Sequence, residues 1–338
     1  MSASTTSSSS VEHGFNFSKF YSGEFEKISE HIYRLNIPYA MAEKVFPKFT
    51  IPVSVFLVHD SLQSRYSLVD VGPPGYEQII MKALAKFFDK GEEEEHYKQA
   101  LLEIDQVLIT HFHIDHCGGV RKLWEYSDQA LPVYSHSQDL EYIRDGKKFR
   151  EQKSEYWLFG MTKYLFSDPK MEVPCQNLDM IMNSKESTIK ATTRDYIKEE
   201  KKNETSEKVV ENGQQIIEET QHETNNSKSS TIVESSSNAP HRHCLCACHC
   251  PGHTAGHTCF YHEEDRVLIC GDALQNLTKK KSKLEYSYPL SSFNLSMSKQ
   301  NIKQLVNSLS NEIDIVFPSH TYSMSGHTIE EVLKFVNK

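Results

Sequence analysis

Four potential metal ligands lie close together in this chain, directly after a short apolar run that is typical of a buried strand. The run Val107–Ile109 is followed by His111, His113, Asp115 and His116. Successive side chains of a strand point to opposite faces, so His111 and His113 at its end point the same way. Asp115 and His116 follow where the chain turns into a helix, and they can face a second ion nearby. A histidine-rich surface loop is the alternative, but chance rarely supplies this set after a buried strand, so the motif predicts a metal site.

Three further segments each place one metal-binding side chain where an apolar run ends or turns. They contribute His253, Asp272 and His320. An open α/β architecture gathers functional groups at such strand-to-loop junctions. Each residue alone is weak evidence, because a lone aspartate after a strand is usually a turn or a helix cap. Together with the first motif, they indicate one composite site formed by distant parts of the chain.

The rest of the chain reads as alternating strands and helices. Runs of β-branched and aromatic residues predict strands over residues 28–37, 53–59, 66–71, 107–109, 133–134, 266–270 and 313–317. Apolar residues at helical spacing predict helices over residues 79–88, 302–309 and 329–336. Thr328 and Glu331 have the spacing of a capping box at the start of the last helix. The alternation predicts an α/β fold.

Two segments of biased composition are expected to be disordered. Residues 1–12 are a Ser-rich tail, and residues 183–240 are a low-complexity insertion rich in Ser, Thr, Asn, Lys and Glu. Such segments bury too little apolar surface to offset the entropy lost on ordering. Within the insertion, Asn212-Gly213 predicts a short hairpin. One domain is therefore expected in two parts, residues 13–182 and 241–338.

The overall composition excludes several classes of protein. The 338 residues carry a net charge of −9, which argues against a dedicated nucleic-acid binder. Every apolar run is shorter than the roughly 18 residues of a membrane-spanning helix. The Ser-rich start lacks the basic flank and apolar stretch of a secretory signal. We therefore expect a cytoplasmic protein with a small-molecule substrate and with neither nucleic acid nor membrane as a partner.

In order and spacing, the ligand-bearing segments resemble the five-motif set of the metallo-β-lactamase superfamily. Asp70, in Val69-Asp70-Val71-Gly72, is similar to the early Asp-x-Gly turn of that family. The resemblance covers roughly residues 26–182 and 241–338, and it implies a four-layer αβ/βα sandwich of two mixed sheets with external helices. It also implies two metal positions, with one metal on His111, His113 and His253, the other on Asp115, His116 and His320, and Asp272 bridging them.

The resemblance implies a dinuclear metal-dependent hydrolase. Imidazole and carboxylate ligands suit Zn²⁺, so two Zn²⁺ ions are expected, although Fe or Mn would also fit. A hydroxide that bridges the metals would attack a small ester, lactone or thioester, because metal binding lowers the pKa of water to about 7. Asp115 is expected to orient this hydroxide and take up its proton. A phosphodiesterase or nuclease of the same fold and a mononuclear-iron oxidoreductase similar to sulfur dioxygenases are the alternatives.

The layout is most similar to the compact hydrolases that include the N-acyl-homoserine-lactone lactonases. Only one helix is expected after His320, which disfavours the glyoxalase II-type thioesterases, whose helical glutathione-binding domain lies there. The lactonases place a tyrosine a few residues after the bridging aspartate, whereas residues 273–276 here contain none. Tyr322 is a candidate replacement.

Three features stay outside the composite site. The cysteines between Cys244 and Cys250 alternate along one expected strand face, and we interpret them as small core residues, because structural zinc sites space their cysteines as C-x₂₋₄-C. The aromatic residues between Leu140 and Phe166 fit ordinary packing better than a cap over a substrate pocket. His257 is expected to be a structural neighbour of the ligands.

Overall fold

The computed structural model describes residues 20–39, 50–62, 64–91, 93–144, 175–177, 244–278, 283–288 and 291–338. The tail at 1–12, the insertion at 183–240 with its Asn212-Gly213 hairpin, and most of the aromatic stretch at 140–166 lie outside the described residues. Within these ranges, no helix combines the length and the apolar character needed to cross a membrane.

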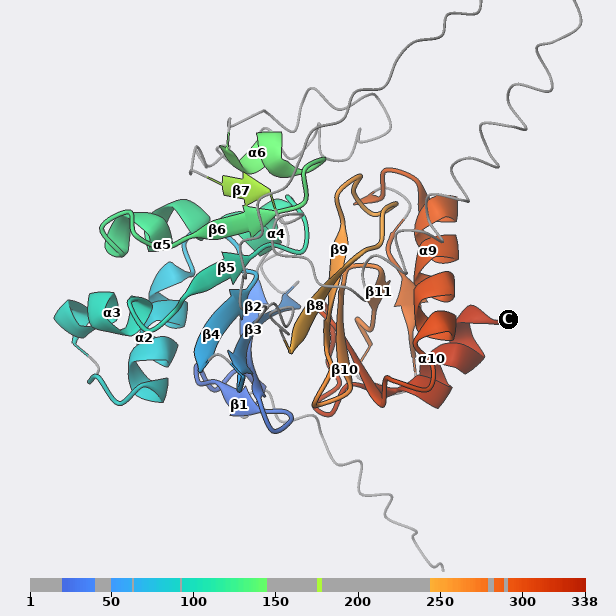
Figure 1. Cartoon of the computed structure of the whole chain (residues 1–338), viewed down its shortest axis with the longest axis horizontal. Coiled ribbons are helices and arrows are strands. Elements are labelled where there is room, and N and C mark those ends of the chain that lie inside the picture. The colour runs from blue at the N-terminus through green and yellow to red at the C-terminus, as the bar shows by residue number, and fades with distance from the viewer. Residues whose placement is uncertain are drawn as a thin grey trace, which may run out of the picture. The chain divides into compact units, whose positions relative to one another are not determined.

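In the described part of the chain, seven strands form a first mixed sheet, in sequential order (Figure 1). They are β1 (Glu26–Lys27), β2 (Ile32–Tyr39), β3 (Ile51–Asp60), β4 (Arg65–Val69), β5 (Gln106–Leu108), β6 (Val133–Ser135) and β7 (Cys175–Asn177). The pairs from β1 to β4 are antiparallel, and those from β4 to β7 are parallel. Parallel neighbours end at the same edge of a sheet, so the segments that follow β4, β5 and β6 lie side by side.

A second mixed sheet has the order β14-β13-β10-β9-β8. Its strands are β8 (Leu245–His249), β9 (Thr258–His262), β10 (Val267–Gly271), β13 (Ile315–Pro318) and β14 (His327–Thr328). The pair of β10 and β13 is parallel, so the residues after these two strands also meet at one edge. A short ribbon of β11 (Leu274–Gln275) and β12 (Glu285–Tyr286) follows β10.

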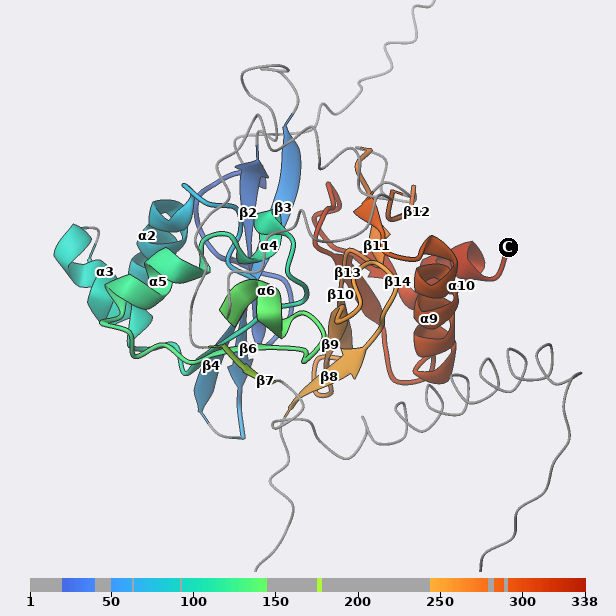
Figure 2. The same cartoon turned by 90° about the horizontal axis from the view of Figure 1, so that it is seen from above.

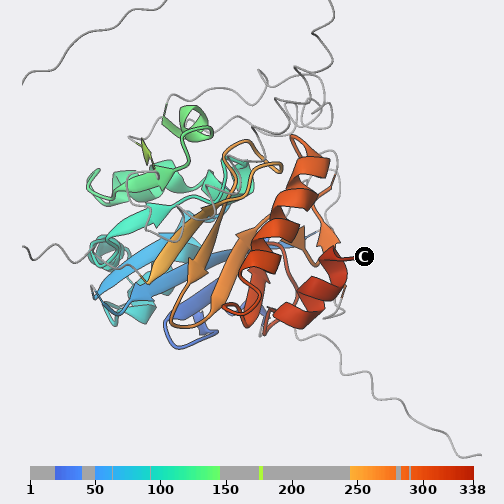
Figure 3. The same cartoon turned by 45° about the vertical axis from the view of Figure 1, so that its right-hand side comes forward.

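Helices cover the outer faces of the two sheets, and the sheets face each other between them (Figure 2). The first sheet is flanked by α2 (Glu77–Phe87), α3 (Glu94–Leu101) and α5 (Val120–Tyr126), with α4 (Ile114–Cys117) and α6 (Leu140–Arg144) near its end. The second sheet is covered by α9 (Leu295–Ser308) and α10 (Ile329–Val336), the red helices of Figure 3. The predicted four-layer αβ/βα sandwich of two mixed sheets is thereby confirmed. The capping box of Thr328 and Glu331 at the start of α10 is also confirmed.

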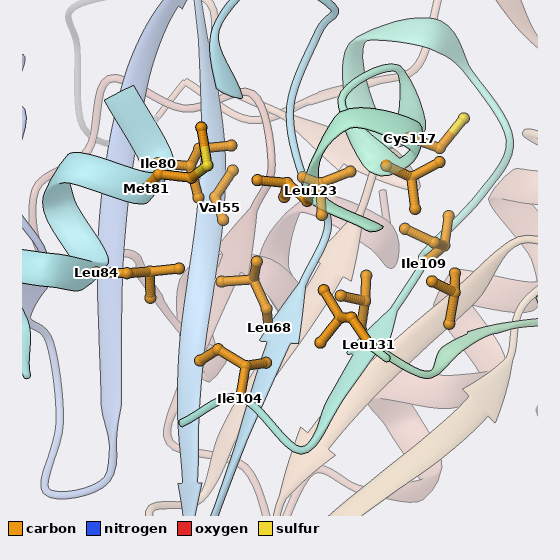
Figure 4. Close-up of a cluster of buried hydrophobic side chains, with 14 of the residues drawn as sticks. Val55, Leu68, Ile80, Met81, Leu84, Ile104, Ile109, Cys117, Leu123 and Leu131 are labelled. Carbon is orange, nitrogen blue, oxygen red and sulfur yellow. The ribbon is translucent and has the colours of Figure 1, made fainter. Parts of the chain in front are cut away.

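Two hydrophobic cores hold these layers together. Val55, Leu68 and Leu84 belong to the core between the first sheet and its helices (Figure 4). Phe56 and Phe317 belong to the core between the two sheets, with ring centroids 6.2 Å apart. Because β3 contributes to both cores, it is buried along nearly its whole length, which explains its continuous apolar sequence.

Every strand and helix predicted within the described residues corresponds to an element of the structure, but several ends differ. β2 begins at Ile32 rather than at residue 28, because the N–H of Ile28 donates to the Ile32 carbonyl and closes a turn. β4 ends at Val69 rather than at residue 71, because Asp70 has a φ of 61° and leaves the extended conformation. These ends depend on local turns, which apolar periodicity does not report.

Truncating a leucine in the first core should cost far more stability than truncating one at the surface. Leu68 is 0% exposed, whereas Leu102 is 60% exposed. We expect Leu68→Ala to lower the free energy of unfolding by about 2–5 kcal/mol, because it removes apolar contacts and leaves a cavity. Leu102→Ala should change it by less than about 0.5 kcal/mol. Denaturant unfolding of both variants measures the difference, and equal effects would contradict this description of the core.

Candidate metal centre

The seven candidate ligands meet at one end of the two facing sheets. On the side of the first sheet, the segment after β5 and helix α4 contribute ligands. On the side of the second sheet, the β8–β9 loop and the residues just after β10 and β13 contribute the others. In chain order they are His111, His113, Asp115, His116, His253, Asp272 and His320. The Asp115 side chain, at 13% exposed, faces solvent more than those of its neighbours Asp272, His116 and His320. The structure thus brings together side chains that lie up to about two hundred residues apart in the sequence.

Three imidazoles converge at one position in this site. The distance from His111 Nε2 to His113 Nδ1 is 3.0 Å, and His253 Nε2 lies 3.1 Å from the former and 2.9 Å from the latter. All three rings are buried. Three ring nitrogens this close to one another are typical of ligands that share one metal ion.

A second group lies beside the first and contains the carboxylates. His320 Nε2 lies 3.3 Å from Asp115 Oδ2 and 3.2 Å from Asp272 Oδ2. Asp272 also reaches the other ligands, because its oxygens lie 3.3 Å from His116 Nε2 and 3.5 Å from His253 Nε2. Asp272 therefore contacts both groups, as a bridging ligand must.

Hydrogen bonds on the far side of the rings determine which nitrogen faces the centre. His116 Nδ1 donates to Asp70 Oδ2 at 2.8 Å, and His320 Nδ1 donates to the Pro52 carbonyl at 2.7 Å. Because Nδ1 of each ring is the donor to these groups, Nε2 is the nitrogen that faces the other ligands, and in the neutral ring it carries the lone pair that a metal would bind. This arrangement is typical of histidines that bind metal.

Asp70 supports histidines in two segments at once. Besides His116, its carboxylate accepts hydrogen bonds from the N–H of Thr110 at 2.8 Å and from its hydroxyl at 2.8 and 3.0 Å. The same hydroxyl lies 3.0 Å from His111 Nδ1 and can accept from it. The early Asp-x-Gly turn therefore orients a ligand in each of the two groups, a function that its sequence does not reveal.

The two groups differ in their electrostatics. Burial lowers the pKa of His113 to about 4 and those of His111 and His253 well below the usual value, so these rings are neutral at neutral pH. Burial would also lower the pKa of His320, but the carboxylates of Asp272 and Asp115 raise it to about 10. The carboxylates thus favour a positive charge at the second position, which protons or a divalent metal can supply.

Two buried atoms test whether a metal fits this site. His116 Nε2 and Asp272 Oδ1 are both buried and lie 3.3 Å apart, and neither makes a well-formed hydrogen bond to the residues that the structure describes. A buried polar atom without a partner costs about 1–3 kcal/mol. A divalent metal would satisfy both atoms, and the surrounding nitrogen and oxygen donors are those that Zn²⁺ accepts. The residues present therefore fit a metal-binding site.

Asp139, which lies after β6, connects the two loops that carry the three converging imidazoles. Its buried carboxylate accepts hydrogen bonds from the Phe112 N–H at 3.3 Å, the Thr254 hydroxyl at 2.6 Å and the Gly256 N–H at 2.7 Å. A Cβ on residue 256 would lie 2.6 Å from Asp139 Cγ, so this contact requires glycine. Burial raises the pKa of Asp139 to about 6, although the hydrogen bonds oppose that rise. Its position after a predicted strand is the one sequence signal that points to it.

His257 is a structural neighbour of the ligands, as predicted. Its Nδ1 donates to the Cys250 carbonyl at 3.2 Å, and its Nε2 accepts from the Asp272 N–H at 3.1 Å. Cys250, Cys259 and His257 are close enough to hold a metal, but both nitrogens of His257 already have backbone partners. The cysteines of Cys244–Cys250 are all buried around β8, as expected for core residues.

The tyrosines around the site differ from the sequence-based expectation. The Tyr322 hydroxyl donates to the Thr50 carbonyl at 3.0 Å, so it is bound to the backbone rather than free for a substrate. Tyr39, at the end of β2, is buried, and both this burial and the charge of Asp115 raise the pKa of its phenol. Tyr39 therefore stays protonated beside Asp115, and the sequence contains no motif that identifies it.

A comparison with protein families identifies the family to which this chain belongs. The family model of the metallo-β-lactamase superfamily matches residues 50–320, which include all seven candidate ligands. The chain belongs to the metallo-β-lactamase superfamily. The sandwich of two mixed sheets agrees with this assignment.

Individual relatives in this superfamily are distant. The probable metallo-hydrolase YflN of Bacillus subtilis is 26% identical over 88 residues, which are 26% of this chain and 29% of that protein. The lactamase-like protein adaB of Aspergillus niger is 36% identical over 97 residues, which are 23% of this chain and 31% of that protein. The chain therefore spans about a third of the length of the curated relatives that it matches.

Several solved structures superpose on most of the chain. TTHA1623 in a di-iron-bound form has a TM-score of 0.45 and 20% identity, over 84% of this chain and 93% of that one. A metallo-β-lactamase from Pontibacter korlensis has a TM-score of 0.49 and 12% identity, over 93% and 99% of the two chains. The assignment to the superfamily rests on the family model and not on these superpositions.

Removing the charge of Asp139 should loosen the metal centre. We expect Asp139→Asn to weaken zinc binding by about 10–100-fold, because the amide keeps the shape but has only one acceptor oxygen for three donors. Competition with a chromophoric chelator measures the affinity. Asp128→Asn, at an exposed position, is the matched control and should bind zinc like the unaltered protein. Equal affinities of the two variants would show that Asp139 does not position the ligands.

Proposed function

We propose that this protein is a dinuclear metal-dependent hydrolase that cleaves a small ester, lactone or thioester. The observation that carries the proposal is the contact of Asp272 with both ligand groups, at 3.5 Å from His253 Nε2 and 3.2 Å from His320 Nε2. A carboxylate between two sets of imidazoles suits two metals that share one ligand, as in two-metal hydrolytic sites. Membership of the superfamily supports the same class of chemistry.

In this proposal, each metal has three ligands of its own. His111, His113 and His253 would hold one, Asp115, His116 and His320 would hold the other, and Asp272 would bind both. Zn²⁺ is the proposed metal, because neutral imidazoles and carboxylates are its usual nitrogen and oxygen ligands. When bound, the metal pair would activate a water molecule at neutral pH and polarise the carbonyl oxygen of the substrate.

Asp115 is the proposed catalytic base. Burial would raise its pKa, but His116 and His320 lower it below the usual value, so the carboxylate is ionised at neutral pH. Asp115 is the most exposed member of its group, so solvent reaches it more readily than Asp272 or His320. It would therefore orient the attacking water and accept its proton, while the other ligands stay buried.

The backbones of two half-exposed aromatic residues are linked to the His253 segment, and their side chains are the proposed contacts for an apolar part of the substrate. The Phe293 N–H donates to the His253 carbonyl at 2.9 Å, and Ser292 Oγ, 3.5 Å from His253 Nδ1, donates to the Tyr288 carbonyl at 3.1 Å. Tyr288 is 53% exposed and Phe293 is 48% exposed. Large apolar side chains exposed next to a polar centre are typical of a ligand-binding rim. This rim favours an acyl or ring substrate over a highly charged one.

A substrate panel tests the proposed reaction. Zinc-loaded protein should hydrolyse at least one of a set of lactones, thioesters and esters, and a chelator should abolish this activity until zinc is restored. His113→Ala should lose at least about 100-fold in kcat/KM, because it removes a ligand whose loss displaces the reacting groups. His96→Ala, at a partly exposed histidine of α3, should keep full activity.

Two outcomes of this panel would contradict the proposal. Cleavage of phosphodiesters or RNA alone would indicate a phosphodiesterase or nuclease. Full turnover by His113→Ala would show that the seven-residue site is not the active one. If the panel instead shows hydrolysis of a lactone, thioester or ester, the best substrate decides between the lactonase-like branch and the other compact hydrolases.

A further inference from the structure

A second cluster of metal-binding side chains lies at the opposite end of the strands from the catalytic site. The N–H of Thr258, at the start of β9, donates to the carbonyl of Thr110, next to the first ligand. β9 ends at His262, and at about 3.3 Å per residue the two ends of this strand are roughly 13 Å apart. His262, His31 and Asp265 each offer a donor atom, and these atoms lie within 4.8 Å of one another.

The carboxylate of Asp265 is the centre of this cluster. His31 Nδ1 lies 2.7 Å from Asp265 Oδ1, and the N–H of His31 donates to the other carboxylate oxygen, also at 2.7 Å. His262 Nδ1 lies 3.7 Å from the same Asp265 Oδ1. A second carboxylate is in reach, because Glu264 Oε2 lies 3.7 Å from His31 Nδ1.

These separations are close to those of a tetrahedral zinc site. With metal–ligand distances of about 2.0–2.2 Å, the donor atoms of such a site are roughly 3.3–3.5 Å apart. The three distances of 2.7, 3.7 and 3.7 Å lie on either side of that value, so small side-chain rotations would bring two nitrogens and two oxygens around one ion. Two neutral imidazoles and two carboxylates would carry a charge that a divalent cation neutralises.

The environment of His262 indicates more than an ion pair. Asp265 needs only His31 to form a hydrogen-bonded pair, yet a second imidazole lies against it, with the two ring centroids 5.5 Å apart. The His262 ring is 0% exposed. Burial lowers the pKa of this ring, so the ring is neutral, and Nδ1 carries the lone pair that a metal would bind. Its Nδ1 at present accepts from the Asp265 N–H at 3.2 Å, a contact that a metal would replace.

We infer that His31, His262 and Asp265, with Glu264 as a fourth ligand, form a structural binding site for a divalent cation of the zinc type. The site does not depend on the proposed hydrolase activity. It is accessible from solvent, since the His31 side chain is 20% exposed and that of Glu264 is 39% exposed. It joins the turn before β2 to the β9–β10 hairpin, so a bound ion would cross-link the two sheets at the end away from the proposed catalytic site.

Zinc stoichiometry tests this site directly. The full chain and its variants are equilibrated with zinc, dialysed and analysed for bound metal by mass spectrometry. His31→Gln should bind one zinc per chain fewer than the unaltered protein and should keep its hydrolytic activity. The matched control is His59→Gln, because the His59 ring lies 6.0 Å from that of His31 but is not among the ligands. It should bind as much zinc as the unaltered protein.

Two further variants keep the outcome decisive. Glu264→Gln, at an exposed position, should weaken the same zinc equivalent even if His31→Gln folds poorly. His113→Ala, in the catalytic site, should still contain the zinc that depends on His31. The inference is wrong if His31→Gln and Glu264→Gln both bind zinc with the stoichiometry and affinity of the unaltered protein. If His113→Ala loses activity but keeps the zinc that depends on His31, the result supports a second site that is separate from the catalytic one.

Discussion

The carboxylate of Asp272 is buried among imidazoles between the two sheets, with the mostly covered carboxylate of Asp115 beside it, and the other residues of the site balance their negative charge. A buried carboxylate is stable only when it is paired and hydrogen-bonded. His116 and His320 supply part of the compensation, at 3.3 and 3.2 Å from Asp272. The ring nitrogens of the neighbouring group are neutral and so leave a place for a cation. A site built in this way binds metal because its own donors are otherwise poorly satisfied.

A surrounding layer of hydrogen bonds makes this arrangement rigid. Asp70 ties α4 to the segment after β5, Asp139 ties that segment to the β8–β9 loop, and His257 ties the β8–β9 loop to the end of β10. Each of these three residues connects two segments that carry ligands. Ligands on different segments can keep a common geometry only if such contacts lock them together. The positions of the ligands are therefore a property of the whole end of the sandwich.

The residues of the candidate site and the class of the fold could be predicted from the sequence because both follow local patterns. Donor side chains after apolar runs indicated the composite site, and the runs themselves indicated the strands. Asp139 also follows a predicted strand, but this signal is weak on its own, since a single aspartate after a strand is usually a cap and the sequence does not show which donors it meets. The cluster of His31, His262 and Asp265 could not be predicted either, because His31 lies 234 residues before Asp265 in the sequence. Strand ends such as that of β4 depended on a left-handed turn at Asp70, which hydrophobicity does not encode.

Anomalous X-ray diffraction at the zinc absorption edge, on crystals grown with zinc, tests the central claim most directly. The predicted result is one peak among the nitrogens of His111, His113 and His253 and a second peak between Asp115 and His320, with Asp272 in contact with both. An absence of anomalous density among these seven side chains, in crystals whose zinc content is confirmed, would contradict the claim that they form a metal centre.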